Sequence, residues 1–250
     1  MLLKNFTIEK FIQHHSLVAV TGNMDGSKYV YLIDTISTIE NLKEDFLYSL
    51  VNSLSPTNKN ATGKCKVEYR TILIYPATDD KIQKYFDKKF CITETYEEYK
   101  KTEHVTKIQW IENVFSGNET EKVFYQNKDV SIVGDSKWNE NVDELYLLVL
   151  FRNERYASIR DIEKEDIALL KETKRRVYEL VKEKWDLTPS DMCLYFHYRP
   201  TYYRLHIHAV NISKTTHCLH NCYRSILVDD VIKNISLESK YYKGDMNVID

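Results

Sequence analysis

The alternation of apolar and polar positions in the first third of the chain is typical of β-strands with short helices between them. The predicted elements are strands at 16–22, 28–36 and 67–76, helices at 39–54 and 79–90, and a polar loop at 55–64. The turn-forming residues Asn23 to Ser27 separate the first two strands, and this arrangement predicts a β-hairpin.

The remainder of the chain predicts a sheet with one long helix. Strands are predicted at 105–115, 121–126, 130–135, 144–151, 192–198 and 202–212, and a helix or mixed segment at 222–239. The stretch 161–185 carries one apolar stripe, as an amphipathic helix does. This mixture indicates the α+β class. A boundary near residue 90 divides the chain into an N-terminal domain, 1–90, and a C-terminal domain, 91–250.

Composition narrows the class of partner. The 250 residues are 43% hydrophobic and 29% charged, which is typical of an ordered globular protein. The net charge is -2 and the pI is about 6.5, whereas proteins that bind long RNA usually carry a basic excess. We therefore expect a short nucleic-acid ligand at most. No apolar run is long enough to span a membrane, and the 5 scattered cysteines indicate reduced thiols inside the cell.

Two histidines alternate along the strand at 202–212. Because side chains in a strand alternate between its faces, Arg204, His206 and His208 should share one face, with the two imidazoles about 6.6 Å apart along the strand. If the preceding strand pairs with this one, His197 joins the same face. Three imidazoles and a guanidinium would then line one surface.

Three interpretations of this surface remain open. It could be the wet face of a half-buried strand, a zinc site, or a site where a neutral imidazole attacks phosphorus. The neighbouring arginine disfavours a metal cation and favours the phosphate interpretation. A second cluster, HCLHNC at 217–222, is rich in histidine and cysteine, but its spacing fits no standard zinc finger.

Several segments, in order, are similar to one family. The segments are IYPATDDKIQKYF (74–86), IQWIENVF (108–115), GDSKWNENVDELYLLVLF (134–151), SIRDI (158–162) and HYRPTYYRLHIHAV (197–210). Together they resemble the scavenger mRNA decapping enzymes, a branch of the histidine-triad superfamily. The resemblance implies a pyrophosphatase that cleaves 7-methylguanosine cap dinucleotides and short capped oligoribonucleotides without a metal or cofactor.

The resemblance also implies catalytic roles. His206 matches the nucleophile, which forms a phosphohistidine and releases 7-methyl-GMP, and His208 and His197 match the supporting histidines. One position departs from the family, because Arg204 stands in place of the first triad histidine. Arginine does not titrate near neutral pH, so activity requires that residue 204 only position the strand or a phosphate.

The substrate-binding residues follow from the same resemblance. Trp110 would stack on the cationic methylated base, with a cation–π energy of about 0.5–2 kcal/mol. Glu119, or Glu121 as the fallback, would read the guanine edge. The other residues that match ligand positions are Asp135 for the ribose or base, and Lys137, Lys84, Thr201, Tyr202 and Arg204 for phosphates.

The expected architecture is a homodimer whose smaller N-terminal domain is exchanged between subunits and closes as a lid over a C-terminal histidine-triad domain. The expected location is the cytoplasm, with the nucleus as a second site. Two alternatives stay open. One is a catalytically weak cap-binding paralogue, which Arg204 favours. The other is a histidine-triad hydrolase of other dinucleoside polyphosphates, which Trp110 and Glu119 disfavour.

Overall fold

The computed structural model of the 250-residue chain divides into two compact units, Met1–Lys88 and Lys89–Asp250. It describes residues 7–14, 17–24, 26–35, 60–64, 68–74, 77–79, 82–83, 90–102, 104–118, 122–136, 138–212 and 222–249. In this part of the chain, no helix is long and apolar enough to cross a membrane.

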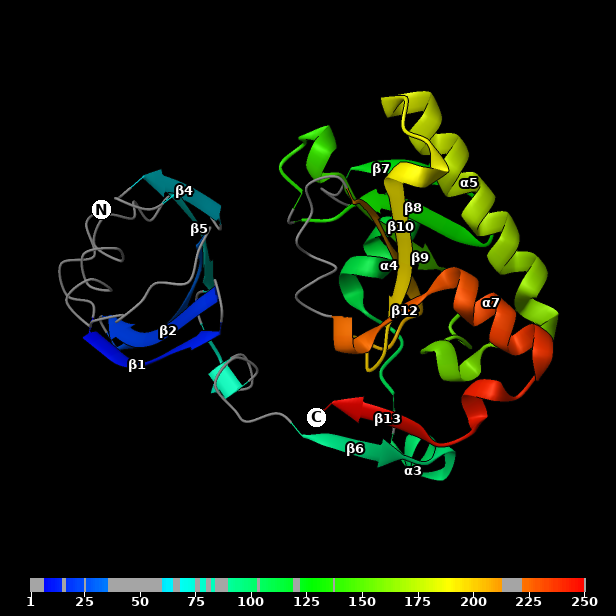
Figure 1. The fold of residues 1–250 in the computed structure, drawn as a ribbon, viewed down its shortest axis with the longest axis horizontal. Helices are drawn as coiled ribbons and strands as arrows, with labels where there is room; N and C mark the ends of the chain where they lie inside the picture. The colour runs from blue at the N-terminus through cyan, green and yellow to red at the C-terminus, as the bar shows by residue number, and fades with distance from the viewer. Residues whose placement is uncertain are drawn as a thin grey trace. The chain divides into compact units, whose positions relative to one another are not determined.

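The first unit is built on an antiparallel sheet with the strand order β1-β2-β3-β5-β4 (Figure 1). Its strands are β1 (Thr7–His14), β2 (Leu17–Met24), β3 (Ser27–Thr35), β4 (Asn60–Lys64) and β5 (Glu68–Ile74). The predicted hairpin is confirmed as β2–β3, and Gly26 takes a φ of 79° in its turn, a conformation that favours glycine.

The loop and the helices predicted for this unit compare differently with the structure. The loop predicted at 55–64 is wrong at its end, because residues 60–64 form β4 and pair with β5. An edge strand needs only main-chain pairing on one side, so polar residues are tolerated there. The helix predicted at 39–54 lies outside the described residues, and of 79–90 only residues 79 and 82–83 are described as helical.

The second unit holds a six-stranded antiparallel sheet in the order β12-β10-β11-β9-β8-β7 and a two-stranded sheet of β6 and β13 (Figure 1). Its elements are β6 (Cys91–Glu94), α3 (Tyr96–Lys101), α4 (Gln109–Ser116), β7 (Val123–Gln126), β8 (Val130–Gly134), β9 (Tyr146–Phe151), α5 (Ile167–Trp185), β10 (Met192–His197), β11 (His206–Asn211), β12 (Ser225–Leu227), α7 (Val228–Leu237) and β13 (Met246–Ile249). The α+β class and the long helix are confirmed.

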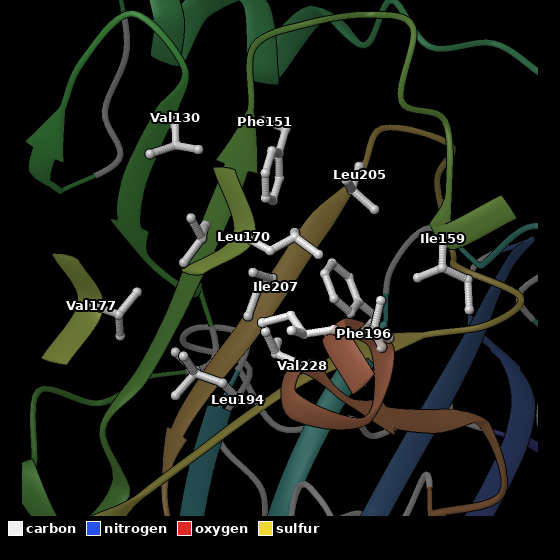
Figure 2. Close-up of a cluster of buried hydrophobic side chains, with 14 of the residues drawn as sticks. Val130, Phe151, Ile159, Leu170, Val177, Leu194, Phe196, Leu205, Ile207 and Val228 are labelled. Carbon is white, nitrogen blue, oxygen red and sulfur yellow. The ribbon is translucent and has the colours of Figure 1, made fainter. Parts of the chain in front are cut away.

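The main core lies between α5, α7 and one face of the six-stranded sheet. Figure 2 shows Leu205 and Ile207 among the side chains of this core, with Leu170 of α5 and Val228 of α7. Helix α4 packs on the opposite face, where Ile111 and Val114 are completely buried against the sheet. Each fully buried leucine or isoleucine contributes about 1.5–3 kcal/mol to the stability of the fold. One face of β11 thus packs in the core with α5 and α7, and its other face lies on the side of α4.

Two predicted strands in this unit need correction. The strand predicted at 105–115 is wrong, because Gln109–Ser116 form helix α4 and Gly117 ends it with a φ of 75°. The apolar residues Ile111 and Val114 are three apart and face the sheet, a helical spacing that the surrounding strand-like residues obscured. The strand predicted at 202–212 begins only at His206.

Candidate functional site

Three imidazoles meet on the α4 side of the sheet. The ring of His197, on β10, lies 4.2 Å from the ring of His208, and the rings of His206 and His208 are 4.9 Å apart. All three residues are buried, at 5–8% exposure. β10 and β11 pair in antiparallel register, with Tyr195 opposite His208. The three imidazoles thus share one face, as the strand alternation predicts.

His206 is held in one tautomer. Its Nδ1 lies 2.7 Å from the main-chain oxygen of Arg204. Because a carbonyl oxygen only accepts hydrogen bonds, Nδ1 carries the proton and Nε2 keeps its lone pair. Burial lowers the pKa of His206 to about 4, and the charge of Arg224 adds to the effect, although the hydrogen bond to Arg204 opposes it. His206 is therefore a neutral imidazole with a fixed lone pair near pH 7.

His208 rests against two tyrosines. The hydroxyl of Tyr146, on β9, lies 2.8 Å from Nδ1 of His208, and the ring of Tyr195 stacks on His208 at 5.1 Å. Burial raises the pKa of the Tyr146 hydroxyl, so it stays protonated and can donate a hydrogen bond. Neither tyrosine is among the residues predicted from the sequence. Alternation from His197 would have placed Tyr195 on the histidine face.

Tyr202 lies between the histidines and Trp110. Its ring stacks on His206 at 4.4 Å with an interplanar angle of 22°, and Trp110 meets its edge at 5.6 Å. Burial raises the pKa of the Tyr202 hydroxyl, and the nearby negative charge of Asp135 raises it further. Trp110 and Tyr202 thus border the histidine cluster. Trp110 is half-buried and reaches this place from helix α4.

Arg204 is turned away from the imidazoles and is 0% exposed. Its Nε donates to the main-chain oxygen of Thr106 at 2.9 Å, and its Nη1 donates to that of Arg152 at 2.8 Å. Its Nη2 forms an ion pair with Glu112 of α4. The prediction that the guanidinium of Arg204 shares a face with the imidazoles is wrong. Residue 204 precedes β11, so the alternation of side chains along a strand does not extend to it. Protein acceptors surround the guanidinium, and the structure favours positioning over phosphate binding.

The remaining residues of the predicted site lie in the turn before β11 or outside the described part of the chain. Thr201 is exposed in the turn that leads to Tyr202, and Tyr203 packs against His104 with ring centroids 3.9 Å apart. The residues that lie outside the described part of the chain are Lys84, Glu119, Glu121, Lys137, His217, Cys218 and His220. Among the described residues, no group of three or more His, Cys, Asp or Glu side chains is placed to hold a metal ion.

The known proteins to which this chain is similar share one description. The family model described as "Scavenger mRNA decapping enzyme C-term binding" matches residues 109–223, a range that contains every predicted site residue except Lys84. The m7GpppX diphosphatase of Ascaris suum is 28% identical over 222 residues, which cover 84% of this chain and 71% of that protein.

Two further relatives carry the same name. The m7GpppX diphosphatase of Caenorhabditis elegans is 28% identical over 252 residues, covering 92% of this chain and 80% of that protein. The m7GpppX diphosphatase of Homo sapiens is 26% identical over 210 residues, covering 79% of this chain and 60% of that protein. The similarity thus extends well beyond the histidine strand.

Proposed function

We propose that this chain is a member of the scavenger mRNA decapping enzyme family and that it hydrolyses 7-methylguanosine cap dinucleotides and short capped oligoribonucleotides, as its similarity to that family and to the m7GpppX diphosphatases supports. The single observation that carries the proposal is the neutral His206, whose lone pair is fixed by the bond to Arg204 beside two further imidazoles. This arrangement suits attack on phosphorus, because a neutral imidazole is the nucleophilic form.

The reaction we propose has two steps. Nε2 of His206 attacks the phosphorus that carries 7-methylguanosine, a P–N bond forms, and the P–O bond to the nucleoside diphosphate breaks. An N–H group of His208 or His197 donates a hydrogen bond to the departing oxygen, which leaves as the anionic terminal oxygen of the diphosphate. Water then attacks the same phosphorus and loses a proton to the solvent, the P–N bond breaks with its electron pair returning to Nε2 of His206, and 7-methyl-GMP leaves. The three buried imidazoles and the nearby charge of Arg224 support this proposal.

Base recognition would rest on Trp110. The 7-methylated guanine is a cation, and a cation over an indole face gains about 0.5–2 kcal/mol. The position of Trp110 beside Tyr202, which itself stacks on His206, supports a base site next to the nucleophile. The roles of Glu119 or Glu121 at the guanine edge, of Lys137 and Lys84 at the phosphates, and of Asp135 at the ribose or base remain predictions.

The finer architecture is also part of the proposal. We propose a histidine-triad fold for residues 91–250 and a lid role for residues 1–90, exchanged between the subunits of a homodimer. A net charge of -2 supports short capped ligands over long RNA. The cytoplasm, with the nucleus as a second site, stays the proposed location.

The cap-binding paralogue is the second candidate, because Arg204 replaces a triad histidine. The surroundings of Arg204 support catalysis despite this replacement. The main-chain oxygen of Arg204 still accepts the hydrogen bond from Nδ1 of His206, and any residue at position 204 supplies that oxygen. The replaced side chain is therefore not needed to set the tautomer of the nucleophile.

Substrate choice tests the proposed function. We expect m7GpppG to be converted to 7-methyl-GMP and GDP, with kcat/KM at least about tenfold above that for unmethylated GpppG or ApppA, since only the methylated base is cationic. Chromatography of the products measures all three reactions. Equal rates on the three would favour the hydrolase of other dinucleotides, and binding of m7GpppG without cleavage would favour the paralogue.

Tyr146→Phe should lower kcat about five- to tenfold, which corresponds to one hydrogen bond of about 1–1.5 kcal/mol. A hydroxyl that donates to Nδ1 of His208 leaves the ring's proton on Nε2, which can donate a hydrogen bond to the departing oxygen. Tyr203→Phe, whose ring packs on His104, serves as the control and should stay within about twofold. An unchanged kcat for Tyr146→Phe would remove this role.

A further inference from the structure

Helix α4 is attached to the nucleophile's strand by a buried arginine. The guanidinium of Arg204 contacts the main-chain oxygen of Thr106, just before the helix, and the carboxylate of Glu112 within it. The same guanidinium donates to the main-chain oxygen of Arg152, after β9. A planar fork with five N–H groups can serve several acceptors at once, which an imidazole with two ring nitrogens cannot.

A second arginine holds the far end of the same helix. Nη2 of Arg152 donates to the main-chain oxygen of Phe115 at 3.3 Å, and its guanidinium lies 4.7 Å from the Phe115 ring. The guanidinium of Arg204 lies 5.5 Å from that ring. The helix is therefore fixed to the end of β9 and the start of β11 before its first turn, in its middle and at its last turn.

This attachment joins the two halves of the candidate site. Trp110 stands in the first turn of α4 and meets the edge of Tyr202 at 5.6 Å, and Tyr202 stacks on His206 at 4.4 Å. On the other side of the nucleophile, the main-chain oxygen of Arg204 holds Nδ1 of His206. One residue thus contacts both the helix that presents the indole and the imidazole that presents the lone pair.

We propose that the Arg204–Glu112 ion pair is a positioning device that sets the distance from Trp110 to His206, and with it the selectivity for substrates whose base and phosphate must be engaged together. The inference rests on the proposed function. Displacing a reacting group by about 1 Å can cost about 100-fold in rate. The pair therefore acts on substrates that use both ends of the site and spares substrates that use only the nucleophile.

The matched variants are Glu112→Gln and Glu154→Gln. Glu112 is 29% exposed and bonded to the guanidinium, whereas the Glu154 carboxylate is 50% exposed and lies 3.8 Å from the same Nη2. Both changes remove one negative charge near Arg204, but only the first removes the charge that anchors α4. Glutamine keeps the size of the side chain and an acceptor oxygen, so the fold should survive.

The substrates are the p-nitrophenyl esters of 7-methyl-GMP and of UMP, which share a leaving group and differ in the base. For Glu112→Gln we expect kcat/KM to fall about tenfold or more on the 7-methylguanosine ester and less than about threefold on the uridine ester. Glu154→Gln should stay within about twofold on both. Equal losses on the two esters in Glu112→Gln, or no loss on either, would overturn the proposal.

A second measurement is independent of turnover. Amide hydrogen exchange of residues 109–116 should be about tenfold faster in Glu112→Gln than in wild type, while α5 keeps its protection as an internal reference. If wild type cleaves neither ester and also leaves m7GpppG intact, the proposed function fails and the exchange data alone decide the positioning role. Unchanged protection of residues 109–116 would then overturn it.

Discussion

Turnover of a 7-methylguanosine cap dinucleotide should fall by a factor of about 10⁴ or more when His206 is replaced by alanine. Nδ1 of His206 lies 2.7 Å from the main-chain oxygen of Arg204, which fixes its proton there and leaves the lone pair of Nε2 free to attack. His208 and His197 lie beside it and are assigned supporting roles at the departing oxygen. The measurement is single-turnover product formation by wild type and variant.

Binding separates chemistry from folding in this variant. Trp110 belongs to α4 and not to β11, so the His206→Ala variant should still bind the cap dinucleotide. Addition of the dinucleotide should therefore still quench the tryptophan fluorescence of the variant. Wild-type turnover should also change little between about pH 5.5 and 8 on account of the nucleophile, since the pKa of His206 is about 4. Residual turnover within about tenfold of wild type would mean that another group attacks phosphorus.

Glu94→Ala should lower the free energy of unfolding of the second unit by about 3–5 kcal/mol, the usual effect of removing one partner of a buried ion pair. Glu94 is 6% exposed and accepts hydrogen bonds from Arg160, which is 0% exposed, and from Nε of Arg199, each at 2.8 Å. The Tyr198 hydroxyl donates to the same carboxylate. The alanine variant leaves the Arg160 charge buried without its carboxylate partner.

Urea denaturation at pH 7.5, followed by tryptophan fluorescence, measures this effect, because Trp110, Trp138 and Trp185 all lie in the second unit. Glu172→Ala is the control, since its ion pairs with Arg175 and Arg176 on α5 are exposed and should contribute about 0–1 kcal/mol. A loss below about 1 kcal/mol in Glu94→Ala would contradict the structural role of the buried carboxylate.

Acid should weaken the fold through the same groups. Burial raises the pKa of Glu94, but hydrogen bonds from Tyr198 and Arg160 outweigh burial and lower it below 4.5. The stability from this carboxylate is present above pH 4.5 and is lost as pH falls through the lowered pKa. His206 acts in the same direction, because its pKa falls from 6.5 to about 4 and its contribution diminishes between those values. The loss of stability that comes from protonation of Glu94 should be absent in the Glu94→Ala variant.

Local periodicity predicted the elements whose patterns are contained in a few residues. The β2–β3 hairpin, β9, β10 and the shared face of the three histidines all follow from alternation over short runs. The pairing of β6 with β13 could not be predicted in this way. Glu94 and Met246 pair although most of the chain separates them in sequence, and neither four-residue strand has a distinctive pattern.

The candidate site shows the same division. Trp110 and Arg204 were named as site residues from the sequence, but the sequence did not indicate what surrounds them in the fold. With 105–115 taken as a strand, Glu112 offered no sign that it reaches Arg204, since that contact depends on α4 being a helix. Tertiary packing, and not the residues next to Arg204, decides where the guanidinium points.

Cleavage of m7GpppG in H₂¹⁸O tests the central claim most directly. Attack by His206 on the phosphorus that carries 7-methylguanosine, followed by water at that same phosphorus, should give 7-methyl-GMP with one ¹⁸O and GDP with none, as read by mass spectrometry. Label in GDP would place the reaction at another phosphorus and contradict the mechanism. Intact m7GpppG after long incubation with the folded protein would contradict the proposed activity itself.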